Sequence, residues 1–148
     1  MDISNNAKKA RPSSTLSISS NANRMIDEGI DIVNFSAGEP DFNTPDYIKE
    51  AAIEAINDNF TKYTPYEGIV ELRQAVADDL KKNCDLDYTP EQIVISNGSK
   101  HAITNAFMAI LNPEDEVIVP APYWNSYIDI IELCYGVPVV VNTTKQNS

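Results

Sequence analysis

The sequence is poor in the side chains that most often build metal centres and nucleophilic active sites. It has one histidine, His101, so a zinc site or a histidine-based catalytic triad has little to draw on. Its two cysteines, Cys84 and Cys134, lie far apart and form no Cys-x-x-Cys motif. We expect both to be core or surface thiols of a protein from a reducing compartment. His101 is expected to be a packing residue or a polar surface residue near the start of a helix.

Basic residues are also scarce, and long apolar runs are absent. Lys and Arg number 11 against 22 Asp and Glu, which gives a formal net charge of −11. This acidity argues against nucleic acid or an anionic membrane as a partner. No run approaches the roughly 20 apolar residues of a membrane-spanning helix. The basic residues near the N-terminus are not followed by the apolar segment of a signal peptide. These observations predict a cytoplasmic location.

Short apolar runs alternate with helical patterns from residue 92 onward. The predicted strands are 93–95, 117–119 and 137–141, and the predicted helices are 99–111 and 127–134. Gly136 is expected to stop the second helix. Alternating strands and helices indicate βαβ units, and continuously apolar strands suit a parallel sheet covered on both faces. The fold class is therefore predicted as α/β.

The first 90 residues are less regular. Residues 1–15 are polar and predict an arm rather than a core element. After it we expect a helix over 16–28 ending at Gly29, a short strand over 32–35, a helix capped by Thr44 with Pro45 at its first position, and a helix over 69–80.

The most informative segment is Ser96-Asn97-Gly98-Ser99-Lys100-His101, between a predicted strand and a predicted helix. The first turn of a helix has free backbone N–H groups, which together with the helix dipole favour an anion such as phosphate. Gly98 lets the backbone approach a ligand closely, and the Ser99 hydroxyl adds a donor. The segment predicts binding of a phosphorylated small molecule. The alternative is that Gly and Ser serve only the geometry of the turn.

Four motifs follow one another along the chain. They are Ser36-Ala37-Gly38-Glu39-Pro40-Asp41-Phe42 with Thr44-Pro45; Tyr63-Thr64-Pro65 with Gly68 and Glu71-Leu72-Arg73; Asn97-Gly98-Ser99-Lys100-His101-Ala102; and Pro113, Asp115-Glu116-Val117-Ile118, Pro122-Tyr123-Trp124 and Ser126-Tyr127. In this order and at this spacing, the chain from about Leu16 onward resembles the N-terminal part of the fold-type I aminotransferases. These are the aspartate aminotransferase-like proteins that use pyridoxal 5′-phosphate.

The resemblance implies a cofactor site on the chain. Gly98, Ser99 and Lys100 match the loop that holds the cofactor phosphate, mainly through the backbone of Ser99 and Lys100. Lys100 is not the Schiff-base lysine, which lies much further along in this family. Trp124 matches the aromatic residue that stacks on the pyridine ring. Without its neighbours, Trp124 would be interpreted as a core or domain-interface aromatic.

Further roles follow from the resemblance at other positions. Tyr63 matches a tyrosine that reaches the cofactor phosphate of a neighbouring subunit, which implies a homodimer. Gly38 matches the loop whose backbone N–H meets the substrate α-carboxylate. Residues 13–15 resemble an arm that closes over the substrate in some members. The plainer interpretations are an ordinary loop tyrosine for Tyr63 and a turn glycine for Gly38.

The chain also departs from the family pattern. Ser99 stands where alanine is common, Glu114 replaces a usual turn glycine, and Asn125 replaces a small apolar residue. The family's Schiff-base lysine, its ring-binding asparagine and aspartate, and its carboxylate-binding arginine have no counterpart in these residues. We therefore expect no catalytic residue here, and no activity from this stretch alone.

The resemblance implies one function and leaves others open. The expected function is the N-terminal part of an aminotransferase that moves an amino group between an aspartate-like amino acid and a 2-oxo acid. Residues 1–44 would form an N-terminal arm and small-domain segment. Residues 45–148 would form the first part of a three-layer αβα large domain that binds the cofactor. The alternatives are a non-enzymatic interaction or cofactor-sensing module of the same fold, a pyridoxal-phosphate-dependent lyase, and a generic phosphate-binding doubly wound domain.

Overall fold

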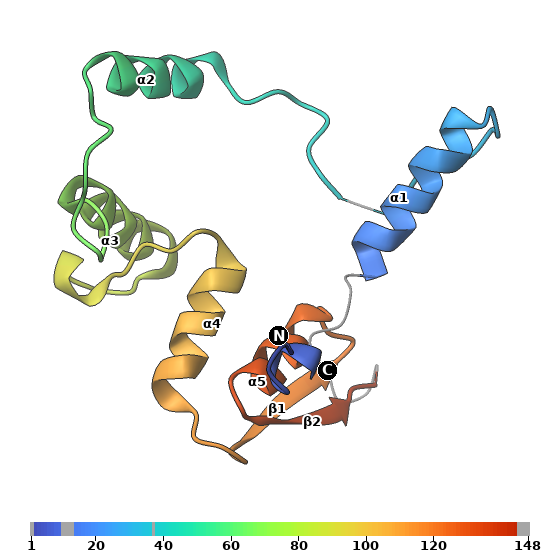
Figure 1. Ribbon diagram of the computed structural model, residues 1–148. Coiled ribbons are helices and arrows are strands. Elements are labelled where there is room, and N and C mark those ends of the chain that lie inside the picture. The colour runs from blue at the N-terminus through green and yellow to red at the C-terminus, as the bar shows by residue number, and fades with distance from the viewer. Residues whose placement is uncertain (1, 10–13, 37, 145–148) are drawn as a thin grey trace. The chain divides into compact units, whose positions relative to one another are not determined.

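The computed structural model describes residues 2–9, 14–36 and 38–144 (Figure 1). The chain divides into two compact units, which are described separately. Unit 1 comprises Met1–Ala10 and Thr64–Ser148, and unit 2 comprises Arg11–Tyr63. The predicted boundary at residues 44 and 45 concerns domains of the complete fold and stays a prediction.

Unit 2 contains two helices, α1 (Ser14–Asp27) and α2 (Asp46–Asn57). Each helix is followed by a residue of left-handed backbone conformation, Gly29 with φ of +79° and Asn59 with φ of 60°. These residues let the chain turn away while the last helical carbonyls keep their hydrogen bonds. Gly29 thus follows α1 as the sequence predicts. The predicted arm of residues 1–15 is wrong at its end, because α1 already begins at Ser14; Ser13 lies outside the described residues.

Two predictions for unit 2 are wrong. Residues 32–35 form no strand, because no strand among the described residues pairs with them, and Phe35 is 92% exposed. Thr44 does not cap α2. The helix begins one residue later than predicted, with Pro45 as the N-cap residue and no side chain capping the free N–H groups. Instead Asp46 places a carboxylate in the first turn, 2.6 Å from the Lys49 ammonium.

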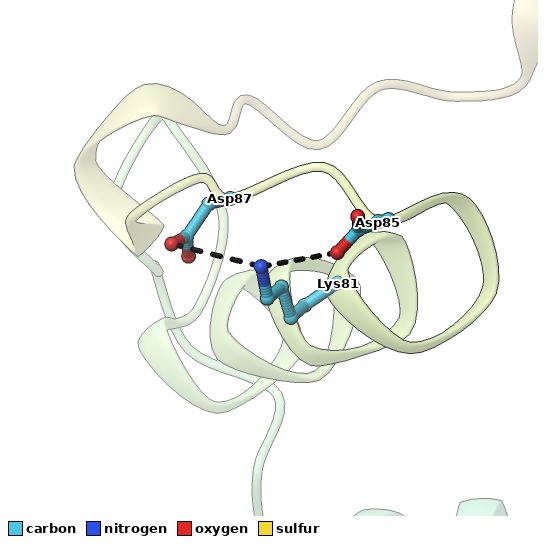
Figure 2. Close-up of polar contacts among 3 residues, drawn as sticks. All are labelled: Lys81, Asp85 and Asp87. Carbon is cyan, nitrogen blue, oxygen red and sulfur yellow. Dashed lines mark hydrogen bonds and ion pairs between the residues drawn. The ribbon is translucent and has the colours of Figure 1, made fainter.

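Unit 1 begins with a short 3-10 helix, η1 (Ala7–Lys9), and continues with α3 (Val70–Cys84). Asp85, with φ of 54°, ends α3. Figure 2 shows the Lys81 ammonium between two carboxylates, 3.2 Å from that of Asp85 and 3.9 Å from that of Asp87. All three side chains are more than half exposed, so these ion pairs contribute little to stability.

The rest of unit 1 is a helix followed by a parallel strand–helix–strand unit. A 3-10 helix, η2 (Pro90–Gln92), precedes α4 (Ser99–Ile110), β1 (Glu116–Ala121), α5 (Ser126–Leu133) and β2 (Val137–Asn142). The two strands pair in parallel, with Ile118 opposite Val139 and Pro120 opposite Val141. The predicted α/β class is confirmed as a mixed, mostly helical fold with a small parallel sheet.

The predicted strand over 93–95 is wrong. Residues 93–96 are extended but pair with no strand among the described residues. Ile93 is buried, and its N–H donates to the carbonyl oxygen of Pro90 at 3.2 Å, while the N–H of Ile95 donates to that of Glu67 at 2.8 Å. These two hydrogen bonds satisfy the backbone locally, but they do not make a ladder.

The core lies between the sheet and its helices. Val119, Ile128 and Ile131 form the buried cluster, and Phe107 of α4 and Val117 pack against it. Cys134 is buried at the end of α5, and burial raises the pKa of its thiol, so the group stays protonated. Cys84 is exposed.

The end of α5 differs from the prediction that Gly136 stops it. The left-handed residue is Tyr135, with φ of 67°. Gly136 comes next, and its N–H donates to the carbonyl oxygen of Ile131 at 2.9 Å. A Cβ on Gly136 would lie 3.1 Å from side-chain atoms of both Ile131 and Leu111. The absence of a side chain at this position thus serves close packing, because a Cβ would press against both neighbours.

The chain turns between α4 and β1 at residues 112–115. The Asp115 carboxylate accepts hydrogen bonds from the backbone N–H of Asn112 at 2.7 Å and from the Asn112 side-chain amide at 3.1 Å. These bonds hold the pKa of Asp115 below its usual value. Glu114 has a left-handed backbone, with φ of 72°, and its N–H donates to the carbonyl oxygen of Tyr135 at 3.0 Å.

Glu114→Gly is expected to stabilise unit 1. A non-glycine residue in the left-handed region costs about 1–2 kcal/mol, and glycine adds about 0.5–1 kcal/mol of unfolded-state entropy. The net gain is about 0.5–1 kcal/mol, measured as a higher urea midpoint. The matched control is Glu116→Gly two residues later in β1, which should destabilise because the strand has no left-handed position. A lower midpoint for both variants would contradict the prediction.

No helix in the described part of the chain is long and apolar enough to span a membrane.

Candidate functional site

A tight turn at Gly98 leads into the start of α4. Gly98 is the N-cap residue, with φ of 83° and ψ of 171°, a region that is open essentially only to glycine. Its N–H donates to the carbonyl oxygen of Ser96 at 2.8 Å, which closes a tight turn. No side chain caps the helix, and the first intrahelical hydrogen bond runs from the Ala102 N–H to Gly98. The N–H groups of Ser99 and Lys100 therefore have no intrahelical acceptor.

The Lys100 side chain lies beside the Trp124 indole. The Lys100 Nζ atom lies 5.3 Å from the ring centroid, within the range of a cation–π contact. Trp124 follows β1 and is 43% exposed. Its ring meets that of Tyr127 edge to face, with centroids 5.5 Å apart and planes at 84°. The structure thus brings together Lys100 of the predicted phosphate loop and the predicted stacking aromatic.

Arg73 lies in the second of the four sequence motifs, which does not itself indicate a role for this side chain, and it joins two loops of unit 1. Its Nε donates to the carbonyl oxygen of Gly68 at 3.1 Å, and its Nη1 donates to that of Pro90 at 2.9 Å. Gly68 has φ of +102°, and its backbone is so close to Ile95 that a Cβ would lie 2.5 Å from the Ile95 Cγ1 atom. The arginine thus holds the Gly68 loop, against which Ile95 packs.

His101 is exposed, and its Nδ1 atom accepts the backbone N–H of Asn97 at 3.0 Å. His101 is thus a polar surface residue near the start of a helix, which was one of the two expectations. Its hydrogen bond to the loop was not predicted. The signal in the sequence was a side-chain acceptor at the third helical position, where glutamate and glutamine of a capping box reach back to the loop.

Tyr63 and Gly38 belong to unit 2. Both are exposed, and the Tyr63 side chain is fully exposed. Gly98 belongs to unit 1. Two residues before Gly38, a hydrogen-bonded chain holds the loop. The Ser36 hydroxyl donates to the Oδ1 atom of Asn34 at 2.6 Å, and it lies 2.7 Å from the Ser19 hydroxyl on α1.

The fold and this site can now be compared with known proteins. Residues 30–148 match the family "Aminotransferase class I and II", and the chain belongs to that family. It corresponds to the N-terminal portion of its members, as the resemblance implied.

Individual relatives agree with this family. The chain is 48% identical over 140 residues to a probable aspartate/prephenate aminotransferase of Rhizobium leguminosarum bv. phaseoli, covering 95% of this chain and 35% of the relative. It is 41% identical over 147 residues to an aspartate aminotransferase of Bacillus subtilis (strain 168), covering 99% of this chain and 37% of the relative.

Among solved structures, the aspartate aminotransferase of Thermus thermophilus with maleate superposes with a TM-score of 0.94 at 41% identity. The match covers 99% of this chain and 38% of that one. The chain thus spans 35–38% of the length of these relatives.

Proposed function

We propose that this chain supplies the N-terminal, phosphate-binding part of an aminotransferase that exchanges an amino group between an aspartate-like amino acid and a 2-oxo acid. The observation that supports the proposal most is the start of α4. There the unpaired N–H groups of Ser99 and Lys100 lie on the same unit as an indole that the Lys100 ammonium contacts. The names of the relatives support aminotransfer over the alternative lyase chemistry.

The residues at this site fit pyridoxal 5′-phosphate. Backbone N–H groups at a helix start and a nearby ammonium suit a phosphate dianion. The Trp124 indole offers a flat apolar surface to an aromatic ring. When bound, the cofactor supplies the electron sink that amino transfer requires. In the proposal, Gly98, Ser99 and Lys100 hold the phosphate and Trp124 holds the ring.

Residues of unit 2 complete the proposal. Tyr63 would reach the cofactor phosphate of a neighbouring subunit in a homodimer, which agrees with its full exposure. The backbone of Gly38 would bind the substrate α-carboxylate, held in place by the hydrogen bonds of Ser36 with Asn34 and Ser19. We further propose that residues 45–148 form the first part of the three-layer αβα large domain of a cytoplasmic protein, and that residues 1–44 form its N-terminal arm and small-domain segment.

No residue of the chain is assigned to proton transfer or to the covalent bond with the cofactor. Lys100 is committed to the turn and to the Trp124 ring. The chemistry would require residues beyond the third of the family's length that this chain spans.

The phosphate turn can be tested through Trp124, the single tryptophan. We expect pyridoxal phosphate to quench its fluorescence at a concentration about tenfold or more below that needed for pyridoxal. Charge-assisted hydrogen bonds contribute about 1.5–3 kcal/mol, and each 1.4 kcal/mol is a factor of ten. Gly98→Ala should abolish this difference, because alanine disfavours the backbone conformation of Gly98.

Two controls accompany this titration. Gly29→Ala replaces another glycine of positive φ whose Cβ would meet nothing, and it should leave the ratio unchanged. Borohydride reduction followed by peptide mapping detects aldehyde that has reacted with surface lysines. Equal quenching by the two ligands in the unmodified chain would contradict the proposed phosphate site.

A further inference from the structure

In the turn before α4, the backbone N–H groups of Asn97 and Gly98 both donate hydrogen bonds to other atoms of the protein. Gly98 donates to the carbonyl oxygen of Ser96 at 2.8 Å, and Asn97 donates to the Nδ1 atom of His101 at 3.0 Å. Both donors are thus occupied within the protein. The N–H groups left without an intrahelical acceptor follow directly in the chain, at Ser99, Lys100 and His101.

The hydrogen bond also defines which ring atom faces the loop. The Nδ1 atom is the acceptor, because a backbone N–H group can only donate. The acceptor comes from the third residue of the helix and reaches back over one turn to the loop, in the manner of a capping-box side chain. It ties the orientation of the Asn97 peptide to the first turn of α4.

We propose that His101 is a positioning residue of the phosphate-binding turn. By accepting the Asn97 N–H, its imidazole fixes the peptide before Gly98 and leaves the donors of Ser99 and Lys100 as those that face the anion. This inference rests on the proposed function for the identity of the ligand, but the effect on the turn stands on the hydrogen bond itself. Any side chain at position 101 whose acceptor atom reaches the Asn97 N–H should take over this role of the imidazole, and an apolar side chain should not.

The first arm of the test uses the full chain without ligand. Hydrogen exchange is followed at single amides by fragmentation mass spectrometry in the unmodified chain, His101→Gln and His101→Leu. We expect the Asn97 amide to exchange about five to ten times faster with leucine, the ratio that a hydrogen bond of about 1 kcal/mol predicts, and to recover with glutamine. The matched control is Asn105→Leu, an exposed polar-to-leucine change one turn later on α4, which should leave Asn97 unaffected.

The second arm measures the ratio of the pyridoxal phosphate and pyridoxal dissociation constants by Trp124 fluorescence. We expect His101→Leu to weaken pyridoxal phosphate alone by about three- to tenfold, and glutamine to restore it. A purely structural role would instead shift the urea midpoint and weaken both ligands together.

The two arms separate the possible failures. If the unmodified chain does not distinguish the ligands, the proposed function fails, and the Asn97 exchange rates alone decide the role of His101. If leucine leaves Asn97 exchange unchanged, or if glutamine does not restore it, the positioning role is overturned whatever the ligands do. The last outcome concerns a chain that binds pyridoxal phosphate more tightly than pyridoxal. If His101→Leu speeds Asn97 exchange there but leaves the ratio of the two dissociation constants unchanged, the role in phosphate binding is overturned.

Discussion

Gly68→Ala is expected to destabilise unit 1 by about 2–5 kcal/mol. Two costs add at this position. Alanine is strained by about 1–2 kcal/mol at the left-handed φ of +102°, and inserting a methyl group into a packed site costs about 1–3 kcal/mol. The clash is severe because the new Cβ would lie 2.5 Å from Cγ1 and 2.8 Å from Cβ of Ile95. The Cβ atom of Ile95 is part of the branch point and cannot swing away.

The measurement is a urea denaturation curve at one fixed protein concentration. Gly29→Ala is the matched control, since φ is +79° there but the added Cβ meets nothing within 4 Å. Gly29→Ala should lower the free energy of unfolding only by the strain of alanine at a left-handed φ, about 1–2 kcal/mol. Combining Gly68→Ala with Ile95→Ala should show coupling, because the second change removes the atom that clashes most closely. A midpoint for Gly68→Ala equal to that of the control would show that the loop moves away freely.

The effect should also reach the start of α4. The carbonyl oxygen of Gly68 accepts a hydrogen bond from Arg73, and that of Glu67 accepts one from Ile95. Displacing this loop therefore moves the segment that leads to Gly98.

A polypeptide of these 148 residues is expected to self-associate. One face of the sheet presents an apolar surface, because Ile118 is 70% and Val141 is 45% exposed, and their partners in register are Val139 and Pro120. Parallel sheets are normally covered on both faces, and unpaired strand edges invite pairing with another chain. A two-stranded sheet has two such edges.

Sedimentation velocity at two concentrations measures this. We expect larger species at the higher concentration, and fewer of them in Ile118→Lys, which charges the exposed face without removing a buried side chain. The matched control is Val33→Lys, which charges a 76% exposed valine of the extended segment in unit 2. A monomer at both concentrations, with a sharp near-ultraviolet melt, would show that the apolar face needs no cover.

Local features were predictable where the sequence itself carries the cause. The helices follow from the spacing of apolar residues, and their observed bounds differ from prediction by a few residues at the ends. Gly98 could be predicted as a special backbone position because only glycine occupies that conformation freely. Glu114 stands where the family has a turn glycine, and the structure places it in the left-handed region.

The family and the approximate place of the turn before α4 were thus determined by the sequence alone. The tertiary structure decided what depends on partners far along the chain. Residues 93–95 are predicted as a strand, but an extended segment becomes a strand only where another offers a full ladder. Here the hydrogen bonds of Ile93 and Ile95 go to the carbonyls of Pro90 and Glu67, and neither belongs to a strand. The role of Arg73 became visible only in three dimensions, because its partners are backbone carbonyls, which every residue carries. For His101 the sequence offers an acceptor at the third helical position, and the structure supplies its partner, the Asn97 N–H.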